Sequence, residues 1–170
     1  MYKNLAEQKY IKEEDLMGRG FLVNDSLKTY DWELTGESKL IGDYTCQKAV
    51  YSRIIDSKVF SMGQDEMETT KDTVNVTAWF TTQIPVSHGP DDFWGLPGLI
   101  LELQNNGMTY IAERIVLNPT DPVQIETPRK GELISSKDYQ ALSEEKMQEM
   151  MKRYSGKPGE GNQMIIKIGN

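Results

Sequence analysis

The chain is poor in the residues on which disulfide, metal and nucleophilic sites depend. Its 170 residues include one cysteine, Cys46, and one histidine, His88. A single cysteine excludes an internal disulfide framework, and a single histidine excludes a site built from several histidines. No stretch approaches 18 consecutive apolar residues, so the sequence contains no transmembrane helix. We therefore expect no metal and no cofactor.

Basic residues are outnumbered by acidic ones. The chain has 26 Asp and Glu residues against 19 Lys and Arg, for a net charge of −7. A phosphate backbone or an anionic lipid surface would repel such a protein on average, so we expect no nucleic-acid partner. The first 20 residues also lack the apolar core of a signal peptide. The length and the 38% hydrophobic content fit one globular domain over residues 1–170.

Alternating apolar and polar residues predict strands through the middle of the chain. In residues 73–82, Val74, Val76, Ala78 and Phe80 alternate with residues of the other face, which include Trp79. Less regular runs predict strands at 19–23, 31–35 and 39–51, the last kinked at Gly42. The charged segment 57–71 is typical of a loop with frayed strand ends.

The second half adds a hairpin and a helix. Asn106-Gly107, between the runs 99–104 and 108–117, predicts a tight hairpin turn. Ser135 or Ser136 is the expected helix cap, with Asp138 available for a capping box. An apolar stripe at helical spacing follows: Tyr139, Leu142, Met147, Met150, Met151 and Tyr154. Glycines and a proline end the helix within 155–162, and 164–168 is a last strand or an ordered tail. The predicted class is α+β, with a mainly antiparallel sheet and one C-terminal amphipathic helix.

The run from Gly95 to Ile100 predicts a structural turn formed by Gly95, Pro97 and Gly98. Pro97 fixes its own φ, and Gly98 supplies the positive φ that the second central position of a type II turn needs. The apolar run 99–103 follows at once, so the turn leads into a buried strand.

These residues resemble the signature of the GLPGLI family of Gram-negative cell-envelope proteins. The resemblance extends to a tryptophan strand at 32–35 and to the block 41–49, which reads I-x-x-Y-x-C-x-K-A, and to an acidic, Met-rich helix after residues 128–131. It covers about residues 20–154. The resemblance implies a periplasmic or cell-envelope location and a single GLPGLI-type domain with no assigned activity. Family members carry more chain before the tryptophan strand, so we expect that a signal peptide and the first strands are missing from this chain.

The order of strands followed by an acidic helix is also similar to that of the LolA-like lipoprotein carriers. This likeness implies a curved half-barrel around an apolar cavity. We therefore expect a non-enzymatic envelope binding protein that carries an apolar or lipid-like ligand. The alternative is a structural or assembly factor of the envelope that acts by protein–protein contact.

Aromatic side chains near the turn are the candidate ligand-binding residues. They are Trp79, Phe80, Phe93 and Trp94, with Leu96 beside them. Pockets for apolar ligands are lined by such side chains. The interpretation we favour is that the same residues form a structural plug that packs against the turn, because aromatic residues dominate cores.

Other candidates for chemistry are weaker. His88 with Asp91 and Asp92 resembles a poor metal site, and a solvated loop histidine is the simpler interpretation. Cys46 and His88 could in principle form a nucleophilic dyad, but a buried, unreactive thiol is favoured. The acidic runs 13–15 and 91–92 lack the alternation of a calcium loop. We also expect self-association, through a free sheet edge or through the first 20 residues, because residues 1–11 have weak strand propensity.

Overall fold

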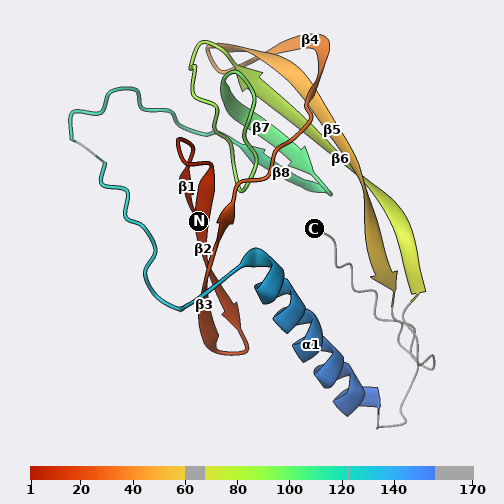
Figure 1. The fold of residues 1–170 in the computed structure, drawn as a ribbon. Coiled ribbons are helices and arrows are strands. Elements are labelled where there is room, and N and C mark those ends of the chain that lie inside the picture. Colours follow the sequence, from red (N-terminus) through yellow and green to blue (C-terminus); the bar gives the residue numbers. More distant parts are fainter. Residues whose placement is uncertain (60–67, 122, 156–170) are drawn as a thin grey trace.

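The chain folds as two β-sheets and one helix in a computed structural model that describes residues 1–59, 68–121 and 123–155 (Figure 1). The four-stranded sheet has the order β1 (Tyr2–Asn4), β2 (Lys9–Leu16), β3 (Arg19–Ser26) and β9 (Glu132–Ile134). The five-stranded sheet has the order β4 (Glu33–Ile41), β5 (Tyr44–Val59), β6 (Glu68–Thr81), β7 (Leu99–Asn105) and β8 (Met108–Ile111). The helix α1 spans Ser136–Ser155. The α+β class is confirmed, but the described strands divide between two open sheets.

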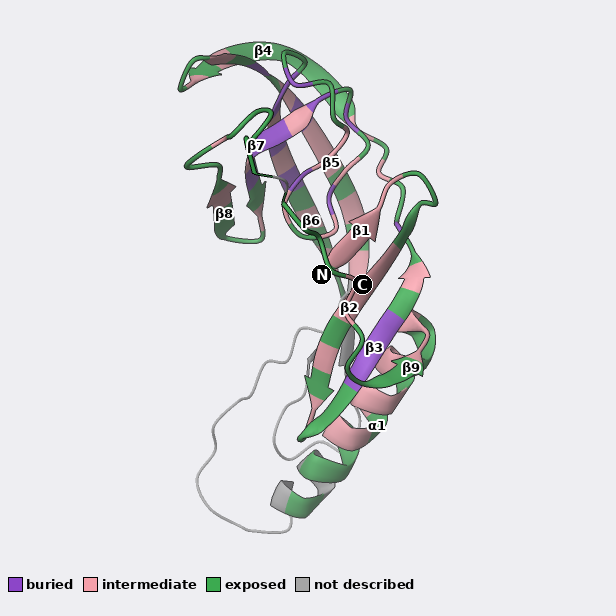
Figure 2. Cartoon of the chain, turned by 90° about the vertical axis from the view of Figure 1, so that its left-hand side faces the viewer, coloured by how far each residue is buried: buried purple, intermediate pink, exposed green. Residues whose placement is uncertain are grey.

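The five-stranded sheet holds the main hydrophobic core on one face. As the alternation in β6 predicts, Val76, Ala78 and Phe80 are buried there, while Trp79 lies on the other face. Antiparallel pairing places Ala78 between Ala49 of β5 and Leu103 of β7, and all three are fully buried. The two alanines in this row leave room for the aromatic residues that pack over the sheet. Figure 2 shows buried residues in these central strands and a separate buried group on β3 of the other sheet.

Turn chemistry predicted one hairpin correctly and misjudged another. Asn106 and Gly107 have φ values of 47° and 81°, which fits a type I′ turn between β7 and β8. The second strand ends at Ile111, however, and does not continue to residue 117. Gly42, expected as a kink within one strand, has a φ of 56° and lies in the turn that separates β4 from β5. The expected loop at 57–71 is also wrong at both ends, because strands reach Val59 and begin again at Glu68.

The four-stranded sheet was largely missed by the sequence analysis. Residues 1–11 were expected to reach toward a neighbouring molecule, but β1 folds back on β2 and pairs Tyr2 with Ile11. β2 then pairs along its whole length with β3, where Phe21, Leu22 and Val23 are buried. β9 joins the other edge of β3 in a parallel pairing of Phe21 with Glu132. Because β9 contributes only three residues and lies far from β3 in the sequence, no local pattern predicts their pairing.

The helix begins as predicted and packs on the four-stranded sheet. Ser135 is the cap: its Oγ accepts a hydrogen bond from the Asp138 N–H (3.0 Å) and donates one to Asp138 Oδ2 (2.7 Å). Asp25 of β3 accepts a further bond from the Ser136 N–H at 3.1 Å. Tyr139 meets the Phe21 ring edge-on, but Met150 remains 45% exposed, so the stripe is only partly a core. The helix ends at Ser155 as expected, and residues 164–168 lie outside the described chain.

Candidate functional site

The segment that links β6 to β7 covers the core face of the five-stranded sheet. Its Phe93 and Leu96 are buried to 5% and 2% exposure and pack in one cluster with Phe80 of β6, which is fully buried. Four further rings pack against this cluster: Tyr30, Trp32, Tyr51 and Tyr110. The centroids of Tyr30 and Phe93 are 5.0 Å apart. Three of the five candidate ligand-binding residues are therefore brought together, in contact with one another and closed to solvent.

Tryptophan side chains connect this segment to the chain that joins the two sheets. Trp94 Nε1 donates to the Lys28 carbonyl at 2.6 Å, and Trp32 Nε1 donates to the Trp94 carbonyl at 2.9 Å. Each indole thus satisfies its only hydrogen-bond donor on a backbone oxygen while its ring covers apolar surface. Trp94 lies at the margin of the aromatic cluster and is half-buried.

Trp79, the fifth candidate, lies on the opposite face of the sheet. The Lys39 ammonium is 4.3 Å from its ring centroid and that of Lys48 is 5.9 Å away. Both lysines are also paired with carboxylates, Lys39 with Glu102 (2.7 Å) and Lys48 with Glu37 (2.8 Å). The sheet separates Trp79 from Phe93 and Leu96, so the five residues do not form one pocket.

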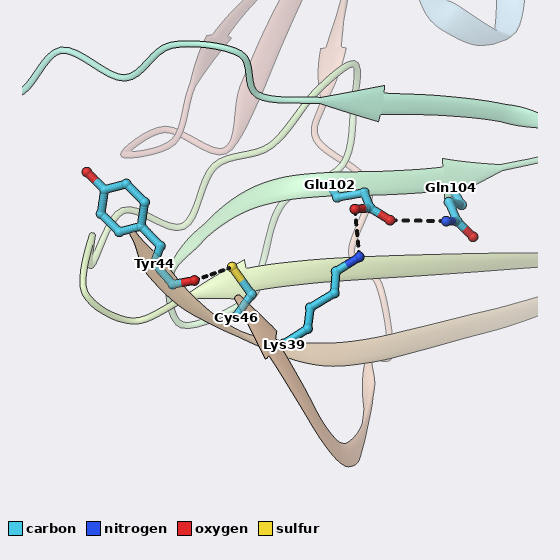
Figure 3. Close-up of polar contacts among 5 residues, drawn as sticks. All are labelled: Lys39, Tyr44, Cys46, Glu102 and Gln104. Atoms are coloured by element: carbon cyan, nitrogen blue, oxygen red, sulfur yellow. Dashed lines mark hydrogen bonds and ion pairs between the residues drawn. The ribbon is translucent and has the colours of Figure 1, made fainter. Parts of the chain in front are cut away.

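The single cysteine lies on the same face of the five-stranded sheet as Trp79. Cys46 has no solvent exposure, and its Sγ lies 3.7 Å from the Tyr44 carbonyl oxygen (Figure 3). Burial raises the pKa of its thiol, which disfavours the nucleophilic thiolate. Beside it, Lys39 and Gln104 both contact the carboxylate of Glu102. The prediction of a buried thiol is confirmed.

The turn before β7 needs its glycines for reasons different from those predicted. Gly98 is not in the left-handed region, so the expected type II turn is wrong, and it is Gly95 that has a positive φ, of 98°. Gly98 instead lies against the end of β6. A Cβ at this position would be 2.6 Å from the carbonyl carbon of Thr81 and closer still to its oxygen. Only a residue without a side chain allows this backbone approach, with Pro97 exposed beside it.

A polar cluster that the sequence analysis missed lies where β1 meets this segment. Lys3 Nζ donates to the carbonyls of Gly89 (2.6 Å) and Phe93 (3.4 Å). Burial lowers the pKa of Lys3 to about 8, although the charges of Asp92 and Asp91 act in the opposite direction. More than 80 residues separate Lys3 from these partners, so no local pattern could have indicated the contact.

Two other groups in this cluster have shifted pKa values. Burial, followed by the positive charge of Lys3, lowers the pKa of His88. Burial and a hydrogen bond with Asp92 raise the pKa of Tyr30. His88 lies in the loop segment, as predicted, and is half-buried, and its backbone carbonyl accepts the Ile100 N–H at 2.9 Å. Within the described parts of the chain, no group of His, Cys, Asp and Glu side chains could hold a metal ion.

Comparison with known proteins identifies one similar family. The model of a family described as proteins of unknown function (Porph_ging) matches residues 32–102, less than half of the chain. The match runs from Trp32 through β4, β5 and β6 into β7, and so covers most of the five-stranded sheet and the segment over its core. No curated protein and no solved structure matches, so nothing supports a LolA-like fold, and the GLPGLI name is not confirmed.

Proposed function

We propose that the protein is a non-enzymatic binding protein of the cell envelope that acts by contact with another protein. The observation that carries this proposal is the exposure of segment 112–131, which joins β8 to β9 without a helix or strand among its described residues. Its apolar side chains Val116, Leu117, Val123 and Ile125 are 58–77% exposed. Clusters of exposed large apolar residues mark interaction surfaces. The envelope location rests on the resemblance to the GLPGLI family.

The packing of the aromatic cluster favours contact with a protein over transport of an apolar ligand. Phe80, Phe93 and Leu96 fill the sheet face on which a carried ligand would have to lie. Opening that space would expose side chains that each contribute about 1.5–3 kcal/mol of burial free energy. A carrier would therefore lose much of its own core on loading.

The Lys3 cluster is the feature most reminiscent of an enzyme, because shifted pKa values gather at active sites. Its geometry supports a structural role better. The Lys3 ammonium is directed at two backbone carbonyls of the covering segment, and Tyr30 and Asp92 bond to each other. An ammonium held by two backbone carbonyls in this way fixes β1 against the covering segment.

Site-specific photo-crosslinking in bacterial cells tests the proposal. A photoreactive amino acid replaces Leu117 or Ile125 in the exposed segment, and the matched control replaces Lys137, an exposed polar residue of α1. We expect one discrete protein adduct from positions 117 and 125 and none from 137. Adducts of equal yield at all three positions would contradict a specific contact. Stoichiometric lipid in an organic extract of the purified protein would support the carrier alternative instead.

A further inference from the structure

Among the described residues, β4 and β8 form the two outer edges of the five-stranded sheet, and these edges differ in how they are protected. β4 carries Glu33, Glu37 and Lys39, and its register shifts between Leu34 and Ser38 around Gly36, whose φ is 78°. Charges and bulges of this kind prevent an edge strand from pairing with another chain. β8 has the sequence Met-Thr-Tyr-Ile, with no charge, no proline and no register shift. The β8 edge therefore lacks the features that close the β4 edge.

The backbone of β8 presents hydrogen-bonding groups to this open side. The Ala112 N–H donates to the Leu101 carbonyl at 2.8 Å, which directs Ala112 toward β7. In an antiparallel ladder the direction alternates along the strand, so Thr109 and Ile111 direct their N–H and C=O groups away from β7. Met108 and Ile111 are also 57% and 60% exposed. Figure 2 shows β8 as the outermost strand of its sheet.

We infer that the β8 edge pairs with β8 of a second copy of this chain, antiparallel and across a two-fold axis. This inference rests on the proposed function, which is binding to a protein partner, and it names a second copy as the partner of the β8 edge. In the register that uses every outward group, Thr109 lies opposite Ile111 of the second copy, and the two Tyr110 residues face each other at the axis. Cross-strand partners then share a face, so Tyr110 meets Tyr110 on the side that carries the core.

Charge favours a second copy at this edge over the other edges. Two chains of net charge −7 repel each other, so a self-contact is most stable where no like charges meet. The other outer strands of the two sheets all carry charges: Lys3 in β1, Glu132 in β9, and Glu33, Glu37 and Lys39 in β4. Each of these strands brings charged side chains into a contact with its own copy, whereas two β8 strands bring no charge together in any register.

The size of the contact sets its strength. An edge of four residues buries less than the roughly 1,200 Å² at which stable interfaces begin. We therefore expect a reversible dimer whose population rises with concentration. The alternative occupant, an extended segment of a different protein, would leave the purified chain monomeric.

Sedimentation of the full chain over a range of concentrations tests the inference with the variants Thr109→Pro and Thr109→Val. Proline removes an N–H that β7 does not use, so the hairpin keeps its own ladder. Valine keeps that N–H and serves as the matched control. We expect wild type and Thr109→Val to dimerise alike, and Thr109→Pro to weaken the dimer by roughly tenfold or more. Ile111→Lys, at a position 60% exposed, should also weaken it while sparing the backbone.

Each other outcome has a distinct meaning. A wild type that stays monomeric at the highest concentration overturns the dimer, while the crosslinks at 117 and 125 still test the proposed function. A dimer that Thr109→Pro and Ile111→Lys leave intact shows that another surface pairs the copies and overturns the role of β8. If Thr109→Pro alters the far-ultraviolet circular dichroism, that variant has disturbed the fold. Sedimentation of Ile111→Lys then tests the role of β8 by itself.

Discussion

The five-stranded sheet and the four-stranded sheet are held together in different ways. The first is covered by a chain segment whose Phe93 and Leu96 join the core residues of β5, β6 and β7 in one cluster. The second is covered by α1, which meets β3 mainly through Tyr139 and Phe21 and leaves Met150 exposed. The family match at residues 32–102 falls almost wholly within the first. The difference indicates that most of the folding free energy resides in the matched region, and that the other sheet is an attachment of lower stability.

Truncating one aromatic residue in each region tests this contrast and should give the largest effect. Phe93→Ala empties part of the buried cluster and should lower the free energy of unfolding by about 3–5 kcal/mol. Tyr139→Ala removes a half-buried edge-on contact and should cost about 1–2 kcal/mol. Urea unfolding followed by circular dichroism measures both. Equal losses in the free energy of unfolding would show that the two regions contribute alike to stability and would contradict the proposed difference between them.

In both regions, the predictions that succeeded rest on local signals in the sequence. The alternation around Val76, Ala78 and Phe80, the Asn106-Gly107 turn and the Ser135 cap are local signals, and each is confirmed. β2 escaped prediction because its charged residues 12–15 hide the strand, which forms only because β3 offers an apolar partner with matching register.

The candidate site, too, could be predicted only in part from the sequence. Composition placed aromatic residues near the turn, and Phe80, Phe93 and Leu96 do meet. The alternation in β6 already separates Trp79 from Phe80, but it could not show which face of the sheet the covering segment with Phe93 and Leu96 packs on. The contact of Lys3 with Gly89 depends on the placement of one sheet against the other, which no short pattern encodes.

The glycines before β7 give a second, somewhat smaller test within the matched region. Gly98→Ala should destabilise the fold by about 2–4 kcal/mol, because its Cβ would collide with the Thr81 backbone, which cannot move without disturbing β6. Gly95→Ala, the matched control, should cost only about 1–2 kcal/mol for its positive φ, because the added Cβ would meet Trp32 at an ordinary contact distance of 3.8 Å. Thermal unfolding compares the two. A larger loss from Gly95→Ala would mean that backbone conformation, and not close approach, governs this turn.

The smallest expected effect concerns the contact that joins the two regions, Lys3 with the carbonyls of Gly89 and Phe93. The pKa of Lys3 is about 8 in the folded chain, lowered from 10.5 by burial. Between these two values the unfolded chain binds more protons at Lys3 than the folded chain does, so the contribution of Lys3 to stability rises with pH. Below pH 8 the side chain is charged in both states and the burial penalty is paid in full. Because the side chain is partly open to solvent, we expect a gain of only about 1 kcal/mol from pH 8 to pH 10.

Other charged and titratable groups surround Lys3, so the measurement must isolate this one. The charges of Asp91 and Asp92 act on it, His88 lies near it, and Tyr30, whose pKa is raised, acts in the opposite direction at high pH. Lys3→Met keeps the length of the side chain and removes its charge. The free energies of unfolding of wild type and Lys3→Met, measured by urea titration from pH 7 to pH 10, should therefore differ progressively in favour of wild type as the pH rises. A difference that is constant with pH would show that Lys3 titrates alike in both states, and that the ammonium is not buried between the two sheets.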